Sequence, residues 1–225
     1  MTRPLWPTQR PSNAGLSDTH VLAARGSAYG HLGQYPSAVA DFARLTDADS
    51  DEPFHWFSLA MAHLGADDMD GYRKVCARMS AKFGKTRDPD TAAHLVFAFK
   101  VVAEPGVDSA QLVQWGKIAQ GSPSRPIKRT LGQALYRDGK FEEVIDYYDQ
   151  FAKSQALWVD DELLLAMAHH KLGRMDKARA NYARASKRID ELERIVANKG
   201  GYWYWTDQVI ERRLHKEAKA LLQEK

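Results

Sequence analysis

The stretch Leu59-Ala-Met-Ala-His63 occurs a second time as Leu165-Ala-Met-Ala-His169, and both copies lie in apolar segments with helical spacing. Two further segments share this frame, because each carries two glycines seven residues apart. The small residues that align across the four segments are separated by 34, 72 and 34 residues; they are Gly26, Ala60, Gly132 and Ala166. The middle separation is two periods plus a short insertion. A fixed period of this length predicts a solenoid built from repeated helix pairs.

The repeated unit resembles the tetratricopeptide repeat, a helix-turn-helix of about 34 residues with small and large residues at set positions. Three units carry this resemblance, through Gly26, Tyr29, Gly33, Ala38 and Phe42, through Gly132, Leu135, Gly139, Val144 and Tyr148, and through Ala166, Gly173, Ala178, Tyr182 and Ala185. The second unit departs from the pattern. It has Asp67 in place of the turn glycine and Tyr72 in place of a small residue. We therefore expect its second helix to start late or to tilt.

The resemblance implies an all-α fold, an α-solenoid of about five antiparallel helix-turn-helix repeats with a C-terminal capping helix. The predicted repeats lie near residues 19–52, 53–88, 89–122, 125–158 and 159–197. Residues 206–225 have an apolar stripe on one side, which predicts the cap that covers the last repeat. Residues 1–16 are rich in Pro, Ser, Thr and Arg, so we expect a flexible N-terminal tail before a solenoid over residues 17–225.

The order of features along the chain is also similar to the tetratricopeptide tails of large planctomycete-type bacterial signalling proteins. This narrower resemblance depends on Asp70-Gly-Tyr-Arg73 and Asp88-Pro-Asp-Thr91. It implies that the chain descends from a larger protein or is cut from one.

Composition narrows the range of partners. The 32 Lys and Arg residues nearly balance the 29 Asp and Glu residues, and no long basic block is present. A net charge of +3 therefore favours neither nucleic acid nor an anionic membrane surface as a partner. The single cysteine and the lack of a signal-like apolar segment near Met1 predict a cytoplasmic protein.

Fragments that resemble catalytic or metal motifs are each incomplete. Gly84-Lys-Thr86 has the end of a phosphate-binding loop, but Met79 stands where its first glycine belongs. Asp47, Asp49 and Asp51 alternate as in a calcium loop that lacks its glycine and closing Glu. The neighbours His169 and His170 point about 100° apart on a helix and cannot share one metal. The sequence therefore predicts no enzyme activity, no cofactor and no metal site.

The resemblance implies that the first helices of the repeats line a concave groove that holds a partner protein. The groove positions predicted to bind the partner are Phe57, Met61, Arg129, Gln133, Tyr136, Arg137, Met167, His170 and Lys171. These positions combine apolar and cationic side chains, so we expect a protein or peptide that is acidic and partly apolar. The predicted function is a non-catalytic protein-protein interaction scaffold.

An aromatic run near the C-terminus gives a second candidate surface, formed by Tyr202, Trp203, Tyr204 and Trp205. It could cover the end of the last repeat, or it could offer stacking faces to a peptide or a sugar. Two other functions stay open beside the scaffold. One is a self-assembling structural module in which the same surfaces meet other copies of the chain. The other is an enzyme in an atypical helical fold.

Overall fold

A computed structural model describes residues 18–48, 50–102, 106–199 and 204–223. These residues form twelve helices and no strand, so the predicted all-α solenoid is confirmed. The helices pair in chain order: α1 (Asp18–His31) with α2 (Tyr35–Asp47), α3 (Pro53–Gly65) with α4 (Met69–Phe83), α5 (Pro89–Phe99) with α6 (Ser109–Ala119), α7 and α8 (Arg125–Lys128, Thr130–Arg137) with α9 (Phe141–Ala152), and α10 (Val159–Lys171) with α11 (Met175–Lys199). The last helix is α12 (Trp205–Gln223). The predicted tail over residues 1–16 lies outside the described residues.

The turns inside the repeats need left-handed backbone, which explains the repeated glycine. Gly33, Gly139 and Gly173 have φ between 69° and 73°, a region that glycine enters without steric penalty. Asp67 takes the equivalent place with φ of 56°, and it is the one described non-glycine residue with positive φ. The following helix α4 begins two residues later, at the same distance as in the glycine turns. The expectation of a late start for this helix is therefore wrong.

Helix starts are marked by acids and prolines. Asp68, Asp88 and Asp108 each accept a hydrogen bond from a backbone N–H in the first turn of the helix that follows. Such caps satisfy donors that have no partner within the helix. Pro53 and Pro89 occupy first-turn positions, where a missing N–H has no consequence.

Close crossings hold two of the helix pairs together. A Cβ atom on Gly132 would lie 2.6 Å from Tyr148 Cζ, and one on Gly26 would lie 2.9 Å from Phe42 Cε2. Only glycine lets the first helix of these pairs approach the aromatic ring of the second so closely. Tyr72, the other large residue, is fully buried and its hydroxyl donates to the carbonyl of Ala98 at 2.7 Å. This bond joins the second repeat to the third.

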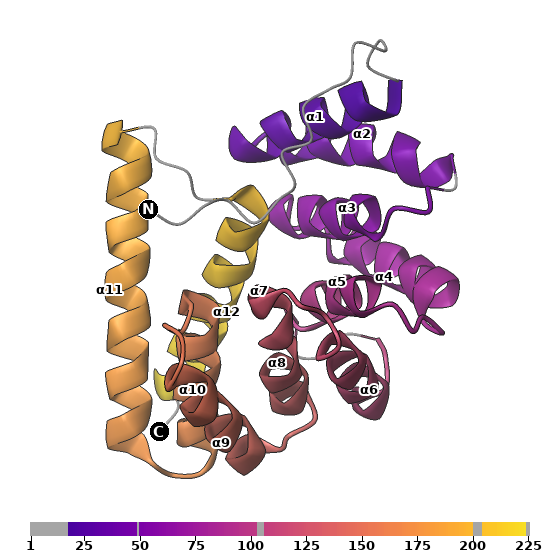
Figure 1. Cartoon of the computed structure of the whole chain (residues 1–225). Coiled ribbons are helices and arrows are strands. Elements are labelled where there is room, and N and C mark those ends of the chain that lie inside the picture. Colours follow the sequence, from indigo (N-terminus) through magenta and orange to yellow (C-terminus); the bar gives the residue numbers. More distant parts are fainter. Residues whose placement is uncertain (1–17, 49, 103–105, 200–203, 224–225) are drawn as a thin grey trace.

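The array curves, and α12 lies inside the curve (Figure 1). It packs on α10 and α11 of the last pair and reaches α3 and α1 at the other end of the array. The predicted capping role is therefore incomplete, because α12 also joins the last repeat to the first two. None of the described helices combines the length and apolar character needed to span a membrane.

Candidate functional site

The candidate site is the inner groove, which we define as the inner face of α1, α3, α8 and α10 beneath α12. The first residue of α12, Trp205, is fully buried against the first repeat. Its ring centroid lies 6.1 Å from that of Phe42 and 6.4 Å from that of Tyr35. Gly30 makes room for the indole, since a Cβ there would lie 2.4 Å from Trp205 Cδ2. A large aromatic side chain thus anchors α12 at the N-terminal end of the array.

Two ion pairs fix the remainder of α12. Arg213 donates to the carbonyl of Leu64 at 2.9 Å and to the Asp67 carboxylate at 2.6 Å, at the end of α3. Arg137 of α8 binds Glu217 through two N–H donors, at 2.6 and 2.8 Å. The side chain of Arg137 is largely buried, and bidentate pairs of this kind also fix orientation. The register of α12 in the inner groove is therefore set at both of its ends.

A third set of contacts holds α12 against α11. His215 stacks on Tyr182 with ring centroids 5.1 Å apart, and its Nε2 lies 2.9 Å from Ser186 Oγ. A serine beside a histidine is the start of a nucleophile and base pair. The described contacts supply no carboxylate hydrogen-bonded to the other ring nitrogen. The pair contributes to the packing of α12 on α11, and burial lowers the pKa of His215.

A buried charge cluster underlies the centre of the groove and consists of Lys100, Arg129, Gln133, Asp160 and Asp161. Asp160 accepts hydrogen bonds from all three donors of the cluster, with Lys100 Nζ at 2.6 Å and Gln133 Nε2 at 3.0 Å. Asp161 accepts from Arg129 Nε at 2.9 Å. The guanidinium of Arg129 also lies over the ring of Trp158, 4.1 Å from its centroid.

The electrostatics of the cluster follow from its burial. Burial alone opposes ionisation of Asp160, but the nearby charges of Arg129 and Lys100 outweigh it and hold the pKa of Asp160 below its ordinary value. Burial lowers the pKa of Lys100, against the attraction of Asp160. Burial, together with the charge of Asp160, raises the pKa of Asp161 against the attraction of Arg129. Two cations and two carboxylates are paired within the cluster, and such a group is strongly destabilised if one member is removed.

The residues predicted to bind a partner are brought together on the inner face, but most are covered. Those buried within the chain are Phe57, Met61, Arg129, Gln133, Tyr136 and Met167. Arg137 binds Glu217 of α12, and Arg129 and Gln133 bind the carboxylates of α10. His170 is half-buried and Lys171 is exposed. Most of these positions are therefore covered in this structure by α12 or by neighbouring helices, and their role in binding a partner stays a prediction.

The aromatic run divides at the limit of the described residues. Tyr202 and Trp203 lie outside them. Tyr204 is half-buried and contacts His31 and Phe54, with ring centroids 5.4 and 6.5 Å apart, while Trp205 is buried as described above. These two rings cover the first and second repeats. The sequence had suggested that the run could cover the end of the last repeat. The return of α12 through the array explains the difference.

Sequence reasoning missed Lys100, Asp160, Asp161 and Glu211. The two aspartates begin α10, where acids are common because they stabilise the N-terminus of a helix, so they give no separate signal. Glu211 lies on α12 beside Ile210, yet it is 6% exposed. The available signal in the sequence was an acidic residue next to the apolar stripe of α12. The stripe alone does not show which surface it covers.

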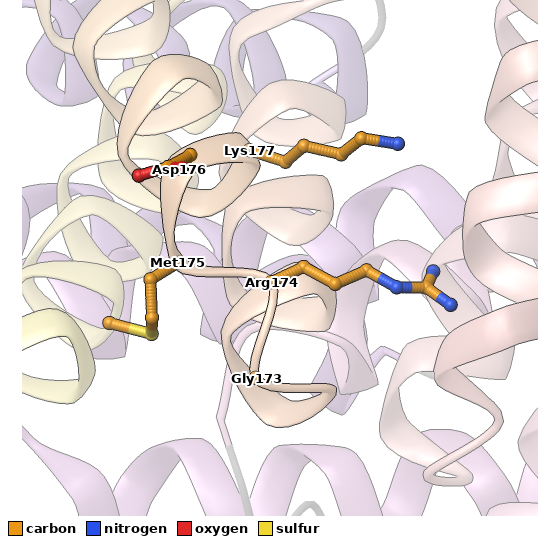
Figure 2. Close-up of a pocket in the computed structure, with 5 residues that line it drawn as sticks. All are labelled: Gly173, Arg174, Met175, Asp176 and Lys177. Atoms are coloured by element: carbon orange, nitrogen blue, oxygen red, sulfur yellow. The ribbon is translucent and has the colours of Figure 1, made fainter.

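Two open hollows lie on the surface of the described residues. Figure 2 shows one at the turn between α10 and α11, lined by Gly173, Arg174, Met175, Asp176 and Lys177. Arg174 and Lys177 extend to the same side there, and Arg174 donates to Glu142 at 2.6 and 2.9 Å. A second hollow lies along α11 at Asp190, Glu193, Arg194 and Ala197. Within the described residues, no group of three His, Cys, Asp or Glu side chains could hold a metal ion.

Comparison with known protein families supports one of the predicted repeats, the one near residues 159–197. The family model of the tetratricopeptide repeat matches residues 163–189, which run from α10 into α11. Two solved structures of MamA are similar at 20% sequence identity: MamA AMB-1, over 77% of this chain and 92% of that one with a TM-score of 0.44, and MamA MSR-1, over 78% and 98% with a TM-score of 0.48. A comparison with curated proteins gives no match. The chain thus contains a tetratricopeptide repeat within a stack of similar helix pairs.

Proposed function

We propose that this tetratricopeptide repeat protein is a non-catalytic protein-interaction scaffold whose inner groove holds an amphipathic helix, and that α12 is the helix resident there. The observation that carries the proposal is that α12 lies along the inner groove from the first repeat to the last. A helix laid with its apolar face in a groove is a recurrent mode of protein recognition. The groove is therefore a surface of the right shape for such a ligand.

The chemistry of α12 supports this proposal. Its buried stripe supplies the apolar anchors, and Glu217 supplies the carboxylate that Arg137 binds. This combination matches the acidic, partly apolar partner predicted from the groove residues. A partner helix with an aromatic first residue, an apolar stripe and an acid at the position of Glu217 would make the same contacts. Several of the residues predicted to bind a partner, such as Met167 and Arg137, would then contact it in the absence of α12.

An exchange experiment tests the proposal on the complete chain. A protease site is inserted between Gly200 and Gly201, the chain is cut after purification, and a fluorescent peptide of residues 204–223 is added. Exchange of the peptide for α12, read by fluorescence anisotropy, is the expected result. A control peptide with Leu214→Asp should not bind, because Leu214 is fully buried in the groove. Cut protein that keeps its helical circular dichroism but takes up no peptide contradicts the proposal.

The second candidate function, self-assembly, uses the same groove. If α12 of one copy enters the groove of another, the chains form swapped dimers or longer assemblies. Light scattering on the uncut chain distinguishes the two, since a scaffold with its own α12 in place stays monomeric across concentration. A cytoplasmic location and the lack of nucleic-acid or membrane partners remain predictions from composition.

A further inference from the structure

Glu211 is a buried acidic residue in the interface between α12 and the groove. It is 6% exposed, and its Oε2 atom has no hydrogen-bond partner among the described residues. An ionised carboxylate in such a place is costly, because it has lost water without gaining a partner. Burial, followed by the nearby carboxylates of Asp160 and Asp207, raises the pKa of Glu211 to about 9.

The groups around Glu211 explain why it finds no cation. Lys100 and Arg129 are already matched by Asp160 and Asp161 inside the buried charge cluster. The helix itself adds two acids to this region, Asp207 and Glu211, one turn apart. Burial and Asp160 raise the pKa of the half-buried Asp207 to about 6. Other titratable or charged groups on elements packed against α12 include His20, Arg25 and His31 of α1, His55 and His63 of α3, Glu162, His169 and His170 of α10, and Arg188 and Glu193 of α11. His215 lies on α12 itself.

We propose that α12 enters the groove with a proton on Glu211, so that the groove is held shut more tightly as pH falls and is released as pH rises. This inference depends on the proposed function, because it describes how the resident helix gives way to a partner. The free carboxyl of Glu211 in solvent has lost its proton at neutral pH, whereas the docked one keeps it. Docking therefore takes up a proton from solution.

The direction and size of the effect follow from linkage. The pKa of Glu211 rises from 4.5 when free to about 9 when docked. Between these values each unit of pH weakens docking about tenfold, because one proton is bound in the docked state and none in the free state. The pKa of Asp207 is about 6, and burial lowers the pKa values of His31, His55 and His215. From pH 7.0 to 8.5 docking should weaken about thirtyfold through Glu211, and comparison with Glu211→Gln separates this effect from that of any other group.

Competition between peptides measures this directly on the cut chain, where the native α12 is the competitor. A peptide of residues 204–223 with Glu211→Gln docks without a proton, so its ability to displace α12 should increase about thirtyfold from pH 7.0 to 8.5. The unaltered peptide should displace α12 equally at both pH values, because it has the same dependence as its competitor. A Glu217→Gln peptide loses the bond to Arg137, so it should displace α12 less well at both values by the same factor.

Equal pH dependence for the unaltered and Glu211→Gln peptides overturns the inference and leaves the proposed function intact. Failure of every peptide to exchange overturns the proposed function instead. In that case the uncut chain still tests the role of Glu211. Its urea midpoint should fall from pH 7.0 to 8.5 relative to that of the E211Q variant, and parallel midpoints would exclude proton uptake at Glu211.

Discussion

The contacts within the repeats and the contacts beneath α12 differ in how much they depend on charged side chains. Within a repeat, a glycine of the first helix receives an aromatic ring of the second, as Gly132 receives Tyr148 and Gly26 receives Phe42. Beneath α12, a glycine-aromatic contact recurs where Gly30 receives Trp205, but ion pairs and the buried acid Glu211 are added to it. The first kind depends on the fit of two surfaces. The second depends on charge as well, and so on pH and on which helix is present.

This difference separates the contacts that maintain the fold of the repeats from the contacts that hold α12 in the groove. The glycine crossings at Gly26 and Gly132 join residues 16 positions apart in the chain, so each lies within one helix pair. The α12 contacts join residues as far apart as Gly30 and Trp205, which are 175 positions apart. Loss of a crossing should therefore weaken the array itself, whereas loss of an α12 contact should open the groove. Substitutions at the two kinds of contact separate loss of stability from opening of the groove.

The largest expected effect is at Arg129. This residue lies at a groove position and also joins two repeats through its bonds to Asp160 and Asp161. Arg129→Leu leaves Asp160 and Asp161 buried without their main cation, which should reduce the free energy of unfolding by about 3 to 5 kcal/mol. Urea denaturation followed by circular dichroism measures it. The neighbouring Lys128→Leu removes a cation from a half-exposed position and is the control. Equal losses in the two variants would show that the cluster contributes nothing specific.

A smaller effect is expected at Gly132. Gly132→Leu should reduce the free energy of unfolding by about 1 to 3 kcal/mol, because the added atoms overlap Tyr148. Gly132→Ala should also destabilise the fold, despite the better helix propensity of alanine, since its Cβ already meets the ring. A double-mutant cycle with Tyr148→Ala tests the cause, because the alanine should cost less once the ring is gone. Unchanged urea midpoints would refute the role assigned to this crossing.

Sequence reasoning worked where the physics is local and repeated. The predicted starts of the first helices agree with the structure within one residue at Asp18, Pro53, Pro89, Arg125 and Val159. The turn glycines were also assigned correctly, because left-handed backbone at Gly33, Gly139 and Gly173 selects this residue. The same reasoning placed the apolar stripe of α12, through Val209 and Leu214, on a buried face.

The site was harder to predict because its contacts are distant and do not repeat. Nothing near Trp205 in the sequence indicates that its ring fits against Gly30, 175 positions earlier. Arg129 stands at a groove position and carries a charge, so an exposed role was expected. Its burial depends on Asp160 and Asp161 of the next repeat, which the family pattern does not specify. The pattern locates the inner face but not the groups that cover it.

Asp67 belongs to both kinds of contact, and it carries the smallest predicted effect. It occupies a turn position that favours glycine, and its carboxylate accepts from Arg213 of α12 at 2.6 Å. Asp67→Gly relieves the left-handed backbone but removes that partner, so the free energy of unfolding should change by less than about 1 kcal/mol. Asp67→Asn tolerates the same backbone and also weakens the pair. Both variants should therefore ease displacement of α12 by the peptide of residues 204–223, while urea midpoints stay close to that of the unaltered chain. If Asp67→Gly alone eased displacement, the turn backbone and not the ion pair would control the groove.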